Sequence, residues 1–241
     1  MAKIIVIEGT DGSGKETQSK RLEKHYLESG YKVKRYSFPV YESATGRIVG
    51  GPFLGKPEIM NTFFEETSSH VDPLVSSLYY AADRRYNFLK EIEKELEEND
   101  IVILDRYTTS NMGFQVAKAK NEKDREKILR FLDILEYDLC ELPRPDLVLF
   151  LHMPLEAACE LRKDREFSDG NEADTEYQRH SEETYLYLCD KCGWEYINCI
   201  NGEYHDISDI KSIETISKEI ITLVDEELKN EENQVMKMTR F

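Results

Sequence analysis

Residues 9–16, "GTDGSGKE", have the spacing of a phosphate-binding loop. Gly9, Gly14 and Lys15 stand where the pattern G-x-x-x-x-G-K-[ST] requires them. Glycines let backbone N–H groups curl around an anion, and the lysine supplies a positive charge to terminal phosphates. The segment therefore predicts a binding site for the phosphates of a nucleotide. The expected members of this site are Gly9, Thr10, Asp11, Gly12, Ser13, Gly14, Lys15, Glu16 and Thr17.

Glu16 departs from the pattern, because a Ser or Thr hydroxyl normally binds Mg²⁺ at this place. A carboxylate can also ligate Mg²⁺, or hold one of its waters. Alternatively, Glu16 faces solvent on the first turn of a helix, where a negative charge is favourable. We favour the solvent-facing or water-mediated arrangement over direct ligation. Thr17 comes one position too late to replace the missing hydroxyl.

Asp105 and Arg106 form a second candidate group, at the carboxyl end of the predicted strand "IVILD". An acid at this point could hold Mg²⁺ or its waters, and an arginine could clamp a phosphate with two hydrogen bonds. Asp-Arg pairs are common on protein surfaces, so the dipeptide alone does not establish a site. Whether Asp105 and Arg106 form a functional site depends on their position relative to the phosphate-binding loop.

The elements that must position these residues alternate between apolar runs and helical patterns. The predicted strands are 3–8, 31–38, 101–105, 145–153 and 194–200. The clearest predicted helices are 17–30, 124–139 and 212–230. Continuous apolar strands separated by helices predict an α/β fold with a five-stranded parallel sheet that is covered on both faces. Ligands of such sheets bind beyond the carboxyl ends of the strands, where both candidate groups fall.

The 241 residues are expected to form one domain over 1–230, followed by a polar and frayed tail at 231–241. Within the domain, the segment 160–182 is dense in charge and poor in apolar residues, which is typical of a mobile lid.

The net charge and the lengths of the apolar runs limit the classes of molecule that the chain can bind. The formal net charge of −16 argues against nucleic acids and anionic membranes, although a small polyanion can bind where positive charge is concentrated. No apolar run approaches the ~18 residues that a membrane-spanning helix needs. Five cysteines and no recognisable secretory leader lead us to expect a cytoplasmic protein.

A set of short motifs resembles the thymidylate kinases, a family of P-loop nucleoside-monophosphate kinases. The motifs are "EGTDGSGK", "FP" after the second strand, "YYAADR" and "DRYTTSNMGFQ". Their order and spacing match over about residues 1–115, and a weaker likeness continues to "CING" near 199–202. The resemblance implies a three-layer α/β/α P-loop kinase fold, phosphorylation of dTMP to dTDP by Mg²⁺-ATP, and a homodimer.

The same resemblance implies roles for matching positions. Tyr80 matches an aromatic residue that stacks on thymine, and Arg84 matches an arginine that binds the base. The expected substrate-binding residues are Asp11, Phe38, Tyr41, Leu54, Tyr80, Arg84, Arg106, Ser110, Asn111, Phe114 and Gln115. The expected catalytic residues are Lys15, Asp11, Arg106 and two lid candidates, Arg162 and Arg165, and the expected metal ligands are Asp105 and Glu16.

Independent physical reasoning supports part of this assignment. An aromatic residue and an arginine four positions later share one helical face and together suit a base. Tyr80 could equally pack in the core, since apolar residues surround it. The phosphate-binding loop has Gly12 and Ser13 where some members carry a basic residue, and the chain has Val40 and Tyr41 where many members have an arginine. An arginine of the lid is therefore expected to stabilise the transferring phosphoryl group.

Two other functions remain open from the sequence. One is a kinase for another deoxynucleotide or a deoxynucleoside, which would differ in the residues that contact the base. The other is a nucleotide-binding protein with little catalytic activity, which is suggested by Glu16 and by the missing arginine after "FP".

Overall fold

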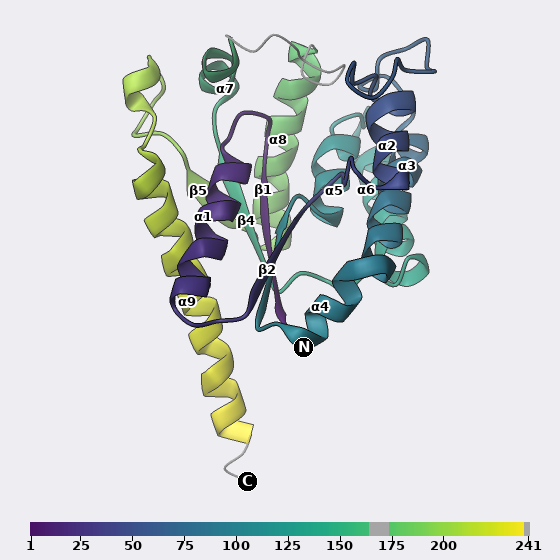
Figure 1. Cartoon of the computed structure of the whole chain (residues 1–241). Helices are drawn as coiled ribbons and strands as arrows, with labels where there is room; N and C mark the ends of the chain where they lie inside the picture. Colours follow the sequence, from purple (N-terminus) through teal and green to yellow (C-terminus); the bar gives the residue numbers. More distant parts are fainter. Residues whose placement is uncertain (164–173, 239–241) are drawn as a thin grey trace.

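Five short strands form one parallel sheet in the order β2-β3-β1-β4-β5 (Figure 1). The computed structural model describes residues 1–163 and 174–238. The strands are β1 Lys3–Gly9, β2 Val33–Ser37, β3 Ile101–Asp105, β4 Leu147–His152 and β5 Glu195–Asn198. Every neighbouring pair is parallel, and Ile5 of the central strand lies opposite both Ile103 and Leu147. The predicted five-stranded parallel sheet is confirmed.

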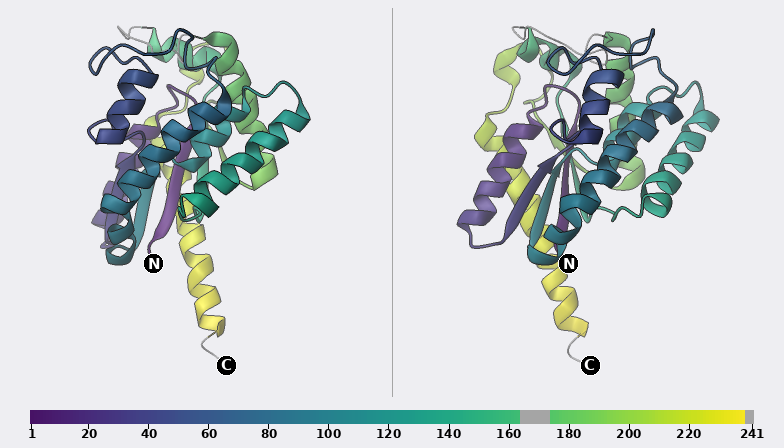
Figure 2. Two further views of the ribbon diagram at one scale, coloured as in Figure 1. Left: turned by 90° about the vertical axis from the view of Figure 1, so that its right-hand side faces the viewer. Right: turned by 45° about the vertical axis from the view of Figure 1, so that its right-hand side comes forward.

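Helices cover both faces of this sheet (Figures 1 and 2). They are α1 Lys15–Glu28, α2 Ala44–Ile48, α3 Pro73–Asn87, α4 Glu93–Glu98, α5 Thr108–Val116, α6 Glu122–Asp133, α7 Leu155–Arg162, α8 Thr175–Cys192 and α9 Ile213–Met238. Because side chains alternate along a strand, Ile5 and Ile7 pack with α1 and α9. Ile4 and Val6 pack in a second core on the opposite face, together with residues of α4.

The carboxyl ends of the strands meet at one end of the molecule, at the top of Figure 1. The chain leaves β1 there through the loop that enters α1, and α7 follows β4 at the same end. Strand order reverses at β1, which has β3 on one side and β4 on the other. Such a switch point is where α/β sheets bind their ligands, so the fold itself brings Gly9 and Asp105 to one edge.

Some boundaries differ from the predicted ones. The first helix starts at Lys15 and not at Thr17, because Gly14 adopts a left-handed conformation (φ 82°) that turns the chain directly into the helix. The predicted helix 124–139 is α6 followed by a π-helical turn at Ile134–Leu139.

The last helix does not end at 230. It continues to Met238, so most of the expected tail is helical and extends below the body of the molecule in Figure 1. Glutamate, glutamine, methionine and lysine favour helices, and no Gly or Pro interrupts them here. The expected lid is bracketed by the end of α7 and the start of α8; its central residues, including Arg165, lie outside the described residues.

Candidate active site

The loop between β1 and α1 forms a small cradle. Gly12 has a φ of 90°, a conformation that glycine adopts without strain. Lys15 reaches back over the loop and donates from Nζ to the Thr10 carbonyl at 2.8 Å. Burial lowers the pKa of Lys15 to about 8, and nearby Arg106 adds to this effect. The loop thus has the backbone shape and the charge that bind the phosphates of a nucleotide.

A hollow opens over this loop, and we call it the loop hollow. Its walls include Asp11, Gly12, Gly14, Lys15, Glu16, Thr17, Phe38, Tyr41, Asp105, Arg106 and Leu161. Three other predicted members of the loop site, Gly9, Thr10 and Ser13, are buried beneath it. The Thr10 hydroxyl is buried and has no hydrogen-bond partner among the described residues.

The two candidate metal ligands lie in different surroundings. The Glu16 side chain is 71% exposed and accepts a hydrogen bond from Lys20 at 2.6 Å, which is the solvent-facing arrangement. Asp105 is buried, and no hydrogen bond from another described residue reaches its carboxylate. Burial raises the pKa of Asp105, although Lys15 and Arg106 oppose the shift. A carboxylate with unused oxygens beside a phosphate site fits Mg²⁺, which usually takes one or two protein carboxylates and phosphate oxygens.

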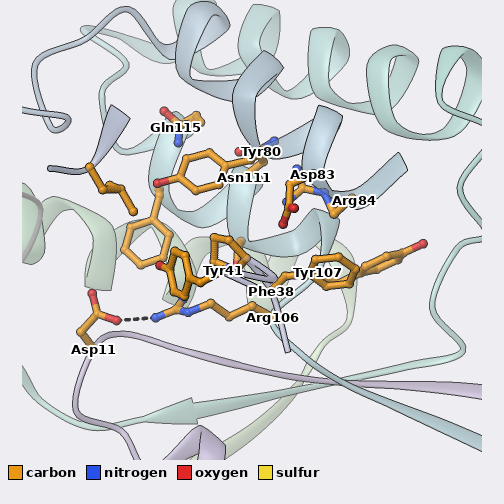
Figure 3. Close-up of a pocket in the computed structure, with 14 residues that line it drawn as sticks. Asp11, Phe38, Tyr41, Tyr80, Asp83, Arg84, Arg106, Tyr107, Asn111 and Gln115 are labelled. Atoms are coloured by element: carbon orange, nitrogen blue, oxygen red, sulfur yellow. Dashed lines mark hydrogen bonds and ion pairs between the residues drawn. The ribbon is translucent and has the colours of Figure 1, made fainter. Parts of the chain in front are cut away.

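Arg106 joins the loop to the segment after β3. Its guanidinium pairs with Asp11 and also donates to the Gly9 carbonyl at 3.3 Å (Figure 3). Burial works against the charge, but Asp11 and other acids raise the pKa of Arg106 above its usual value. Arg106 also lies over the ring of Phe114, 5.1 Å from its centroid. The arginine is therefore charged and held at the edge of the loop hollow.

A second cavity begins at Asp11 and Arg106 and extends between α3 and α5. We call it the aromatic pocket (Figure 3). All the predicted substrate-binding residues line it: Asp11, Phe38, Tyr41, Leu54, Tyr80, Arg84, Arg106, Ser110, Asn111, Phe114 and Gln115. Three residues that the sequence did not suggest, Pro39, Asp83 and Tyr107, complete the wall. The structure thus brings the predicted set together from five separate stretches of the chain.

Arg84 is fixed by a partner that the sequence did not suggest. Its Nε donates to Glu136 Oε2 at 3.0 Å, and a second bond joins Nη2 to Oε1. Both side chains are almost fully buried, at 3% and 1% exposure. Asn111 donates to the same carboxylate at 2.7 Å. One signal could have revealed Glu136: it continues the buried stripe of Ile128 and Leu132 at a spacing of four residues.

Asp83 organises another wall of the aromatic pocket. Its carboxylate accepts hydrogen bonds from the Val40 amide and the Thr45 hydroxyl, both at 2.9 Å, and from Asn87 at 2.8 Å. These bonds tie the "FPVY" segment to α3, the helix that also carries Arg84. Asp83 therefore explains how Phe38 and Tyr41 reach the pocket. Asp83 lies within the motif "YYAADR", but its spacing alone assigned it no partner or role.

Two further groups in the aromatic pocket suit a flat, polar ligand. The Tyr80 ring is braced edge-on by Phe53, with centroids 5.6 Å apart. Gln115 places a buried Oε1 there that has no hydrogen-bond partner within the described residues. A buried acceptor without a donor is unfavourable, so a ligand that carries an N–H group would satisfy it.

Of the two arginines predicted to act from the lid, only Arg162 lies within the described residues. Arg162 ends α7, and its side chain passes Gly12 so closely that a Cβ at Gly12 would lie 3.3 Å from Arg162 Nε. Its guanidinium donates to the Ala158 carbonyl and to Gln178. Arg165 falls outside the described residues.

The comparisons with known proteins agree with this geometry. A family-wide sequence profile described as "Thymidylate kinase" matches residues 7–209. The chain belongs to the thymidylate kinase family. Members of this family are nucleoside-monophosphate kinases, so the chain is a transferase.

Individual relatives extend over almost the whole chain. A "Probable thymidylate kinase" of Thermococcus gammatolerans is 28% identical over 230 residues, which cover 95% of this chain and 98% of the relative. A thymidylate kinase of Prochlorococcus marinus is 33% identical over 172 residues, covering 71% of this chain and 76% of the relative. The thymidylate kinase structure from Candida albicans superposes with a TM-score of 0.63 at 20% identity, covering 93% and 91% of the two chains. At that identity the superposition shows the fold.

Proposed function

We propose that this chain transfers the γ-phosphoryl group of ATP to dTMP and releases dTDP and ADP. One observation carries the proposal: the loop hollow and the aromatic pocket meet at Asp11 and Arg106, which line both. A donor phosphate and an acceptor phosphate bound in the two cavities face each other at this junction. Such a transfer needs no protein nucleophile, because catalysis rests on positioning and on stabilising charge.

The donor triphosphate binds in the loop hollow. Backbone N–H groups of the loop and the N-terminus of α1 face its phosphates, and Lys15 adds a positive charge. When phosphate oxygens approach, Lys15 exchanges its bond to the Thr10 carbonyl for bonds to the nucleotide.

The acceptor nucleotide binds in the aromatic pocket. Tyr80 stacks on the base, while Arg84, Asn111 and Gln115 offer polar groups to its edge. Arg106 clamps the monophosphate with two parallel hydrogen bonds. Phe114 lies against the sugar and favours a deoxyribose.

Mg²⁺ accompanies the ATP, and Asp105 is the residue that would hold it or its waters. The metal supplies positive charge that neutralises the phosphates. Within the described chain, no group of three or more acidic, Cys or His side chains is placed to hold a metal ion.

Glu16→Thr is expected to retain the activity of the native chain or to raise it. The Glu16 carboxylate points to solvent, and exposed substitutions usually change free energies by less than ~0.5 kcal/mol, or about twofold in a rate. The new hydroxyl can approach the metal. Turnover at varied Mg²⁺ concentration is the measurement, with Lys15→Met as the inactive reference. Loss of most turnover in Glu16→Thr would instead make the carboxylate a required metal ligand.

An arginine of the lid completes the site by facing the transferring phosphoryl group. Arg162 already lies against the phosphate-binding loop, and Arg165 is the second candidate. Either would stabilise the charge that builds up during transfer and help to exclude water.

The acceptor specificity tests the proposed function. Purified protein with Mg²⁺-ATP is expected to phosphorylate dTMP with a higher kcat/KM than dUMP, dCMP or thymidine. A preference for another acceptor would assign the chain to a different nucleotide kinase. Tight ATP binding without any transfer would make it a nucleotide-binding protein.

We also expect a homodimer that forms through α3. The outer side of this helix and the turn after it expose Val75, Leu78, Tyr86 and Leu89, each between 40% and 52%. These residues recur at helical spacing, and a continuous apolar stripe of this kind marks an interaction surface. The base-binding residues lie on the opposite side of the same helix, so a second copy can pack here without blocking the pocket.

Leu78→Glu is expected to convert the dimer into a monomer, because it places a charge in the centre of the apolar stripe. Light scattering coupled to gel filtration measures the mass. Leu27→Glu is the matched control, since Leu27 is also about half exposed but lies on α1. A native chain that runs as a monomer at micromolar concentration would contradict the dimer.

We propose a cytoplasmic location without nucleic-acid or membrane partners. The net charge of −16 disfavours polyanionic surfaces. No helix in the described part of the chain is both long and apolar enough to cross a membrane.

A further inference from the structure

Glu8 is a fully buried acid that the transfer chemistry above does not use. Glu8 is the residue of β1 that directly precedes the phosphate-binding loop. Its Oε1 accepts hydrogen bonds from the Thr109 hydroxyl at 2.7 Å and the Tyr107 amide at 3.3 Å. Ser110 donates to the same carboxylate at 2.8 Å, and Tyr185 donates to Oε2 at 2.9 Å. Such a dense set of donors compensates for the burial of a charged group.

These donors show that Glu8 caps α5 from another element. The helix begins at Thr108, and its own N-cap residue, Tyr107, offers no side-chain cap. A carboxylate at a helix N-terminus satisfies free N–H groups and interacts favourably with the helix dipole. Strand β1 therefore carries the cap of the helix that lines the aromatic pocket.

The same carboxylate supports an unusual backbone conformation at Arg106. Arg106 has a φ of 66°, in the left-handed region that non-glycine residues rarely adopt. Its amide donates to the Ile7 carbonyl at 3.1 Å, and the next amide, that of Tyr107, donates to Glu8. Strained backbone persists only where its surroundings fix it, and here β1 fixes two consecutive amides.

Tyr185 connects α8 to this point. Its ring stacks on Phe150 of β4, with centroids 5.0 Å apart and an angle of 3° between the planes. It also fits against Gly113 of α5, where a Cβ would come within 2.2 Å of the ring. Helix α8 starts at Thr175, within the expected lid segment 160–182, so the helix that carries the end of this segment shares a hydrogen-bond acceptor with α5.

We propose that Glu8 is a positioning residue for phosphoryl transfer. It fixes Arg106 and the first turn of α5 relative to the phosphate-binding loop, and through Tyr185 it joins α8 to the same point. This role rests on the proposed function, since Arg106 must face the acceptor phosphate. Glu8 is not itself a catalytic residue, because it is absent from the described residues that line the two cavities.

Two substitutions at Glu8 separate positioning from direct chemistry. Glu8→Ala removes every acceptor and is expected to lower kcat/KM for dTMP by about 100-fold, the effect of a shift of roughly 1 Å at the reacting groups. ATP affinity, measured by equilibrium binding, is expected to stay within about threefold, because the loop amides and Lys15 remain. Glu8→Gln is expected to rescue activity to within about fivefold, since its Oε1 accepts from Tyr107 and Thr109, while the hydroxyls of Ser110 and Tyr185 can rotate to accept from its Nε2.

Tyr185→Phe tests the link to α8 and keeps the ring stack. It is expected to lower kcat/KM for dTMP by about three- to tenfold, and combining it with Glu8→Ala should add nothing further. Tyr26→Phe is the matched control, because its buried hydroxyl bonds to Asp225 between α1 and α9, away from the site. Tyr26→Phe should leave dTMP kinetics unchanged.

Four results would overturn the proposal. Glu8→Ala could keep dTMP kinetics within threefold of the native chain, or lose ATP and dTMP binding equally, as a merely structural residue would. Glu8→Gln could fall as far as Glu8→Ala, which would indicate direct chemistry. If Glu8→Ala does not fold, Tyr185→Phe decides alone, and native dTMP kinetics in that variant would refute the link. A native enzyme that prefers another acceptor refutes only the proposed function, and the same variants are then compared with that acceptor.

Discussion

Arg106→Lys is expected to lower kcat/KM for dTMP by about 10²–10³-fold, the usual effect of removing a group that stabilises the transition state. Lysine keeps the charge but loses the planar fork that binds two phosphate oxygens at once. It also loses one of the two bonds with which Arg106 holds Asp11 and the Gly9 carbonyl. Steady-state kinetics with varied dTMP at saturating ATP measure the effect.

The matched control for this change is Arg85→Lys. Arg85 lies next to Arg84 on α3, but its partner Glu141 is 73% exposed. Its replacement is expected to leave kinetics and stability unchanged. ATP binding to Arg106→Lys should remain near the native value. An Arg106→Lys enzyme with native kcat/KM would mean that the acceptor phosphate binds elsewhere.

Glu136→Ala is expected to lower the free energy of unfolding by about 3–5 kcal/mol, the usual effect of removing one partner from a buried ion pair. Burial opposes the charge of Arg84, and Glu136 compensates by raising the pKa of Arg84. Without Glu136, the buried charge of Arg84 has lost its partner. The change also removes one acceptor of Asn111, which keeps only its longer bond to the Ser77 carbonyl. Urea denaturation followed by circular dichroism measures the loss.

A double variant distinguishes the stability role from the binding role. Arg84→Met combined with Glu136→Leu replaces the pair by apolar groups, and such replacements are often neutral or stabilising. It should therefore regain stability without regaining dTMP affinity. Glu141→Ala, which breaks the exposed pair of Arg85, is the control and should change stability by less than ~1 kcal/mol. A Glu136→Ala protein as stable as the native chain would show that Arg84 finds another partner.

Much of the framework could be predicted from local sequence. The run "IVILD" matches β3 residue for residue, because a strand buried on both faces reads as a nearly continuous apolar run, here Ile101 to Leu104. The phosphate-binding loop is equally local, since its glycines and lysine lie within seven residues. The continuation of α9 beyond residue 230 was not predicted, because the polar C-terminal residues were interpreted as a frayed tail although their types favour a helix.

The candidate site was predicted less completely, for a physical reason. The residues that face the pocket carry recognisable motifs, whereas the residues that hold them act across long stretches of chain. Glu136 lies 52 positions from Arg84, and Glu8 lies 99 positions from Tyr107. Pairings of this kind depend on how α3, α5 and the sheet pack, which no local pattern encodes.

The ion pair between Asp11 and Arg106 gives the empty enzyme its own counter-ion. Under the proposed function, an acceptor phosphate displaces Asp11 from the guanidinium, so that binding exchanges one anion for another. A free phosphate or sulfate would gain only the contacts of Arg106, whereas a nucleotide would also gain the contacts of its base. We therefore expect the pair to favour a whole nucleotide over a bare anion at this place.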